Sequence, residues 1–173
     1  MEKQKRRFGD RKDGRLLRNL DGMHFITPLI YPNRCDNEAY ISESIDLTNM
    51  NAYITKKNET ETEFPYTMFH LVLAALMKTI TLRPKLNRFY ANENYYQRNK
   101  VTAGFIIKKE FSDGSEEAVA LLDAAPTDTV DTVHEEIRRR VYATRHEQKL
   151  NTTDNSMDIL NKLPRFLSKA AIR

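Results

Sequence analysis

Apolar and polar positions follow two periods along this chain, and they predict helices and strands in a mixed order. Apolar residues recur every three or four positions over residues 69–82, which predicts a helix there. They lie on nearly every side of that helix, so we expect it to be deeply buried. The same helical spacing predicts helices over residues 50–57 and 130–147.

Strand patterns occupy two regions. Residues 39–47 alternate between polar and mainly apolar positions, which predicts a strand with one apolar face. Residues 95–98, 101–110 and 117–123 are further strand candidates, and the sequence SDGS between the last two is typical of a hairpin turn. Three successive strands joined by turns predict an antiparallel meander. The expected fold class is therefore α/β, of the α+β type, with a mainly antiparallel sheet and packed helices.

Prolines and the end of the chain change this picture in two places. Pro28 and Pro32 interrupt and close an apolar stretch at 24–31, and they argue against a long regular helix there. Residues 157–172 carry apolar positions at helical spacing, with Pro164 as a kink or a second start. This stripe runs to the last residues of the sequence. We expect something else to cover it, either further chain, a partner or a membrane surface.

Composition excludes several classes of protein. With 40% hydrophobic residues, the chain of 173 residues can form a real core and is not globally disordered. No apolar run approaches the ~18 residues that a membrane span needs. The N-terminus is charged and lacks the apolar region of a secretory signal. The single cysteine, Cys35, cannot form an internal disulfide, which favours a cytoplasmic location.

Positive charge is concentrated at the N-terminus. Residues 1–18 contain eight Lys or Arg side chains and three acidic ones, whereas the rest of the chain is nearly neutral. We therefore divide the chain into a basic arm, residues 1–22, and one domain, residues 23–173. The arm can contact an anionic surface. Phe8 is the one aromatic residue among these charges, so nucleic-acid recognition is not favoured.

Motifs for catalysis or metal binding are absent from the sequence. It has no glycine-rich phosphate loop, and its four histidines fall in different predicted elements, so we predict no metal site. His70 lies in the predicted buried helix, where it is either a packed core residue or a catalytic base. His134 and His146 lie on a charged helix and are expected to be exposed to solvent. His24 lies next to the arm and is kept as a candidate functional residue.

Three motifs in a fixed order carry a family resemblance. Ser44-Ile45-Asp46-Leu47-Thr48 leads from a strand into a helix, Phe64-Pro65-Tyr66-Thr67-Met68-Phe69-His70 opens the next helix, and Arg83-Pro84-Lys85-Leu86-Asn87-Arg88-Phe89 follows it. Over about residues 23–147 the chain resembles the chloramphenicol acetyltransferase-like superfamily, especially the catalytic domain of 2-oxoacid dehydrogenase acyltransferases. The resemblance implies a homotrimer and acyl transfer from acyl-CoA, as co-substrate, to a thiol, hydroxyl or amine without a metal.

The resemblance stops short of the catalytic residue. The general base of that family is the histidine of a His-x-x-x-Asp-Gly motif, and none of the four histidines here begins one. No catalytic residue is therefore carried over. By motif position, Tyr40, Thr102 and Phe105 correspond loosely to residues that border the acceptor pocket, and ordinary strand packing is the alternative for all three.

Two functional hypotheses follow. The first is a partial acyltransferase-like domain, incomplete at its C-terminus, that ends before its catalytic motif and is inactive alone. The second is a non-catalytic interaction or assembly module, whose contact surface is the apolar stripe over residues 157–172.

Overall fold

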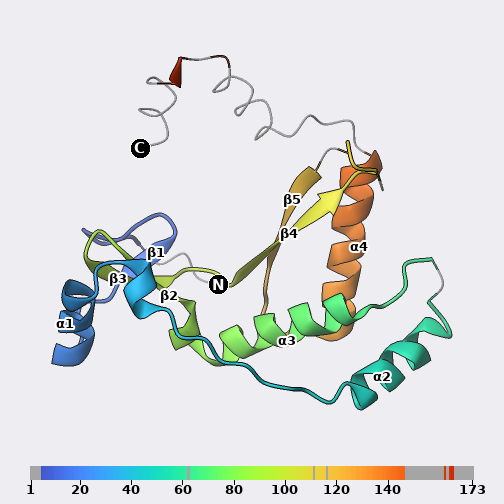
Figure 1. The fold of residues 1–173 in the computed structure, drawn as a ribbon, viewed down its shortest axis with the longest axis horizontal. Helices are drawn as coiled ribbons and strands as arrows, with labels where there is room; N and C mark the ends of the chain where they lie inside the picture. Colours follow the sequence, from blue (N-terminus) through green and yellow to red (C-terminus); the bar gives the residue numbers. More distant parts are fainter. Residues whose placement is uncertain are drawn as a thin grey trace. The chain divides into compact units, whose positions relative to one another are not determined.

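The computed structural model describes residues 5–61, 63–110, 112–115, 117–146, 162, 164 and 165. The predicted helix over 157–172 falls almost entirely outside this part and stays a prediction. The chain forms two compact units, one of residues 1–103 and 121–137, the other of residues 104–120 and 138–173. Along the sequence the elements are β1 (Gly14–Leu16), α1 (Gly22–Ile30), η1 (Arg34–Asn37), α2 (Thr48–Asn58), α3 (Met68–Leu82), η2 (Pro84–Asn87), β2 (Arg88–Ala91), β3 (Asn94–Arg98), β4 (Thr102–Lys108), β5 (Glu117–Asp123) and α4 (Val130–His146) (Figure 1).

The mixed α/β class is confirmed, but the strands form two small sheets instead of one meander. In the first unit, β3 lies between β1 and β2 and pairs antiparallel with both. The β2–β3 turn has positive φ at Asn92 (48°) and Glu93 (58°), as a two-residue hairpin with a primed turn requires. The second sheet consists of β4 and β5. The predicted pairing of β3 with β4 is wrong because β1, from the basic arm, occupies that edge of β3.

The basic arm is folded from about Arg7 onward. Asp10 organises it, because its carboxylate accepts the backbone N–H groups of Arg7 at 2.9 Å and Leu16 at 3.1 Å. These backbone hydrogen bonds are the main reason that the pKa of Asp10 lies below its usual value. Gly14 is needed in β1, since a Cβ there would lie 2.7 Å from the ring of Phe89.

The three helices predicted from spacing are confirmed as α2, α3 and α4. The prolines were expected to prevent a long helix here, and α1 is a short helix of nine residues that contains Pro28 and ends before Pro32. Because Pro28 has no N–H, α1 lacks the hydrogen bond that residue 28 would otherwise donate to the carbonyl of His24. The Asp21 side chain caps the other end by accepting the backbone N–H of His24 at 3.1 Å.

Two predicted burials differ from the structure. Residues 39–47 form no strand, and Tyr40 and Ile41 are 91% and 85% exposed. A strand needs a neighbouring edge for its hydrogen bonds, and no described residue supplies one here. Helix α3 buries a single stripe, made of His70, Leu71, Ala74 and Met77. Other apolar side chains of α3 remain open, Phe69 at 46% and Leu76 at 55% exposed.

The core of the first unit lies around α3 and the start of α4. Its buried hydrophobic side chains are Tyr66, Leu71, Ala74, Met77, Tyr96, Leu122, Val133 and Ile137. In the second unit the buried hydrophobic residues described are Ile107, Ala118 and Ala120. Along β5, buried residues alternate with exposed ones, as expected for a strand with one buried face.

Candidate functional site

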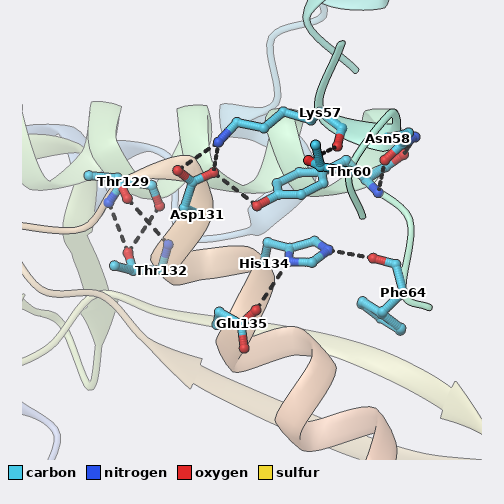
Figure 2. A network of polar contacts seen from close by, with 10 residues as sticks. Lys57, Asn58, Thr60, Phe64, Thr129, Asp131, Thr132, His134 and Glu135 are labelled. Carbon is cyan, nitrogen blue, oxygen red and sulfur yellow. Dashed lines mark hydrogen bonds and ion pairs between the residues drawn. The ribbon is translucent and has the colours of Figure 1, made fainter. Parts of the chain in front are cut away.

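Two buried histidines of the first unit, His70 of α3 and His134 of α4, lie close to less buried side chains from α2, the loop that follows it and α4. Figure 2 shows the hydrogen bonds of His134 and of the less buried members. We call this group the histidine cluster and define it by its members, Lys57, Phe64, Tyr66, His70, Asp131 and His134. These residues are close together although up to 77 positions separate them in the sequence. The ring centroids of the two histidines are 4.9 Å apart.

His70 is held by the first turn of α3. The backbone N–H of Thr67 donates to its Nδ1 at 2.9 Å, so Nδ1 carries the lone pair and the ring proton is on Nε2. His70 is 4% exposed, and Nε2 has no hydrogen-bond partner among the described residues. Burial, and secondarily the neighbouring His134, lowers the pKa of His70 to about 4. The imidazole is therefore neutral near pH 7, and the interpretation of His70 as a packed core residue is the one that its burial supports.

His134 is fully buried on α4, so the prediction that it is exposed was wrong. Its Nε2 donates to the backbone carbonyl of Phe64 at 2.7 Å, and its ring stacks on Tyr66 with centroids 3.7 Å apart. Nδ1 then carries the lone pair and has no hydrogen bond among the described residues. The carboxylate of Glu135 lies 3.8 Å from Nδ1, beyond hydrogen-bond distance.

A hydrogen-bonded triad covers the outer side of the cluster. The hydroxyl of Tyr66 donates to Oδ1 of Asp131 at 2.9 Å, and Nζ of Lys57 lies 2.8 Å from both oxygens of that carboxylate. Burial, and then the adjacent Asp131, raises the pKa of Tyr66 to about 12. The hydrogen bond from Lys57 is the largest cause that keeps the pKa of Asp131 below its usual value.

Asn58 fixes the loop against the end of α2. Its Oδ1 accepts the backbone N–H of Tyr66 at 2.7 Å, and its Nδ2 donates to the Tyr66 carbonyl at 2.9 Å. Both backbone groups of Tyr66 are thereby satisfied by one side chain, which places the aromatic ring over His134.

The histidine cluster is built to hold the fold, because it lacks access for a substrate. A general base must come within hydrogen-bond distance of the proton that it removes, and both imidazoles are enclosed. Lys57 and Asp131 neutralise each other. Among the described residues no group of three or more His, Cys, Asp or Glu side chains could hold a metal ion. In the same part of the chain, no helix is long and apolar enough to cross a membrane.

The three residues predicted to border an acceptor pocket lie in different places. Tyr40 is in the exposed extended segment, where its hydroxyl donates to Glu38 at 2.8 Å. Thr102 begins β4, and its hydroxyl donates to Asp123 at 2.6 Å. Phe105 is partly buried in β4 and belongs to the second unit. Tyr40 and Thr102 are both in the first unit, and Thr102 lines a polar hollow that does not include Tyr40.

The remaining candidate side chains are exposed. His24 lies with its Nδ1 2.6 Å from the carboxylate of Asp21, beside the N-terminus of α1. His146 stacks on Tyr142 near the end of α4. Cys35 is a free, exposed thiol in η1.

Sequence reasoning missed Lys57, Tyr66 and Asp131 as partners, and it misplaced His134. For His134 a signal existed, since it lies one helical turn after Val130 and one before Ile137 and therefore shares their apolar face. For the Lys57–Asp131 pair no local pattern exists, because 74 positions separate them.

Searches with this chain against protein-family models, curated proteins and solved structures returned no match. Function is therefore inferred from the residues and their geometry.

Replacement of Tyr66 by Phe is expected to lower the free energy of unfolding by about 1 kcal/mol, since it removes the hydrogen bond from the Tyr66 hydroxyl to Asp131. The Asp131 carboxylate still has its ion pair with Lys57, which limits the loss. Urea unfolding followed by circular dichroism measures this loss. Tyr40→Phe is the matched control, because its hydroxyl also bonds a carboxylate but the residue is 91% exposed. The control should change stability by less than about 0.5 kcal/mol. Equal losses in the two variants would contradict the role given to Tyr66.

Proposed function

We propose that this chain is a CoA-dependent acyltransferase-like domain that works as one copy of a homo-oligomer, a trimer by the resemblance, and that it does not catalyse transfer alone. Support comes from the order of its motifs. The Ser44–Thr48 motif leads into α2, the Phe64–His70 motif opens α3, and the Arg83–Phe89 motif forms η2 and enters β2. The strand that the resemblance places before the first motif is absent, and the support is limited to the order of the helices that follow the motifs.

The observation that carries the proposed assembly is the incomplete burial of α3. Phe69, Val72 and Leu76 are 46%, 43% and 55% exposed in a helix that is apolar on nearly every side. Such a helix is normally buried, and each large apolar side chain gains about 1.5–3 kcal/mol on full burial. About half of the surface of each of these side chains stays open to solvent. A second copy of the chain would cover them in a homo-oligomer.

The proposed lack of activity in isolation follows from the histidines. None of them begins a His-x-x-x-Asp-Gly motif, and the two in the first unit's core are enclosed. A base for the acceptor group must therefore come from outside this sequence. A cytoplasmic location belongs to the same proposal and is supported by the single, free cysteine, Cys35.

The second candidate function is a non-catalytic assembly module. It is favoured by α1, in which Phe25, Leu29 and Ile30 are 62%, 53% and 60% exposed while Pro28 alone is buried. The C-terminal stripe over residues 157–172 lies almost entirely outside the described residues, so this alternative rests on α1. Binding of acyl-CoA separates the two functions, because an assembly module has no need of it.

Sedimentation velocity of the full chain tests the proposed assembly. We expect the wild type to sediment as a multiple of its 20.2 kDa mass at tens of micromolar. A charge within the apolar face, Leu76→Glu, should shift it toward the monomer. Asn51→Glu, which adds the same charge at an exposed polar position of α2, should not. A monomeric wild type, or a Leu76→Glu variant that is folded by circular dichroism and sediments unchanged, would argue against self-association through α3.

Release of CoA from acetyl-CoA tests the lack of activity in isolation. We expect the chain to release CoA no faster than the protein-free solution when a thiol, alcohol or amine acceptor is supplied. The released CoA should be measured by chromatography instead of with thiol-specific dyes, because the exposed thiol of Cys35 would also react with such dyes. Release above the protein-free rate would mean that this chain contains a base of its own.

A further inference from the structure

A polar hollow with a volume of about 500 Å³ lies in the first unit, between the basic arm, η2 and the connection from β3 to β4. Three cations and one carboxylate line it, together with two amides and a hydroxyl. The lining residues are Lys12, Asp13, Asn87, Arg98, Asn99, Lys100 and Thr102. Neither the histidine cluster nor the exposed face of α3 contributes to it.

Hydrogen bonds between distant segments give the hollow a fixed frame. Asn99 ties the end of β3 to the arm, because its backbone N–H donates to the Asp13 carbonyl and its Nδ2 to the Lys12 carbonyl, both at 3.0 Å. Asn87 ties η2 to the strand connection, with Nδ2 donating to the Lys100 carbonyl at 2.9 Å. The walls of the hollow are thus preorganised by the fold.

Positive charge exceeds negative charge inside this frame. The carboxylate of Asp13 is paired with Arg11 at 2.9 Å, outside the lining, and lies 3.9 Å from the guanidinium of Arg98. The ammonium of Lys100 is paired with Asp123, which also accepts the hydroxyl of Thr102.

Lys12 and Arg98 keep positive charge that the carboxylates do not fully compensate, since Arg98 shares the carboxylate of Asp13 with Arg11. Within the described residues, the ammonium of Lys12 has no ion-pair partner. The guanidinium of Arg98 lies 4.4 Å from the centroid of the Phe89 ring, a cation–π contact that limits its motion.

We propose that this hollow binds the phosphate group of a small phosphate ester. A guanidinium fixed by stacking and a free ammonium are the two donors that proteins use most for phosphate oxygens. The volume lies within the about 300–1,000 Å³ of small-molecule sites, which leaves room for the esterified group beside the phosphate. The inference needs no acyl transfer and stands apart from the proposed function.

Calorimetric titration of the full chain with inorganic phosphate, at constant ionic strength set by chloride, tests the site. We expect saturable binding that Lys12→Glu weakens by at least about tenfold, because it replaces one charge-assisted hydrogen bond by a repulsion. Lys56→Glu on exposed α2 is the matched control and should bind like the wild type. The proposal is overturned if phosphate gives no more heat than chloride, or if Lys12→Glu, folded by circular dichroism, binds phosphate like the wild type.

Two further titrations separate the possible sources of the phosphate. Glycerol 3-phosphate should compete with inorganic phosphate for the site. A different result would overturn the proposal in favour of nucleic-acid contact by the arm. In that case a single-stranded oligonucleotide would bind where neither phosphate compound does, and deletion of residues 1–9 would abolish its binding. Binding of phosphate without binding of acetyl-CoA would sustain the hollow and refute the proposed function. Binding of acetyl-CoA without binding of phosphate would refute the phosphate site and sustain the proposed function.

Discussion

Acidification from pH 7 to pH 4 is expected to lower the free energy of unfolding by about 3 kcal/mol through His70 alone. Burial beside His134 lowers the pKa of His70 from 6.5 to about 4 in the folded chain. Between these two values the unfolded chain binds a proton that the folded chain excludes. The contribution of His70 to the free energy of unfolding is therefore fully present above about pH 6.5 and is lost as the pH falls toward 4.

Urea unfolding at intervals between pH 7 and pH 4 measures this loss, and His70→Gln isolates it. Glutamine at this position of α3 can still accept the backbone N–H of Thr67, as in a capping box, but it does not titrate. We expect the slope of stability against pH to flatten in this variant. The pKa of Asp131 is lowered, so its protonation changes stability mainly below pH 4 and contributes little to the slope between pH 7 and pH 4. An unchanged slope in His70→Gln would contradict the assignment.

Replacement of His134 by Ala is expected to lower the free energy of unfolding by about 3 kcal/mol or more. The ring is fully buried, stacks on Tyr66, and donates to the Phe64 carbonyl. Its removal leaves both a cavity and an unsatisfied carbonyl, and these costs add.

His146→Ala is the matched control for this substitution, since it removes the same side chain from an exposed position of the same helix. It should change stability by less than about 0.5 kcal/mol in the same urea experiment. If both variants were destabilised equally, the contacts of His134 would not be the cause.

Local patterns predicted the elements of this chain better than their partners. The helices over 50–57, 69–82 and 130–147 were predicted because helical spacing and caps are properties of neighbouring residues. The strand over 117–123 was predicted with its observed limits. The pairing partner of β3 was not predicted. It is β1, about 80 positions earlier in the sequence, and no local pattern indicates a contact over that separation.

The two sites differ in how far the sequence could reveal them. His134 lies on the face of α4 that carries Val133 and Ile137, so a stricter use of helical spacing would have placed it in the core. The polar hollow could not have been found, because it combines Lys12 and Arg98 from segments that meet only in the fold. Thr102 was named for an acceptor pocket, a role that stays a prediction, and it lines this hollow instead of a surface shared with Tyr40.

Calorimetric titration of the full chain with acetyl-CoA is the measurement that tests the central claim most directly. A CoA-dependent acyltransferase-like domain should bind it saturably, with affinity in the micromolar to millimolar range usual for substrates, about 1 μM to 1 mM. Binding should occur even though no CoA is released, and it should persist in Lys12→Glu, because acetyl-CoA carries a phosphate ester that the polar hollow would otherwise account for. Absence of binding at millimolar acetyl-CoA, by a chain that is folded and assembled, would contradict the proposed function and leave the assembly module as the better account.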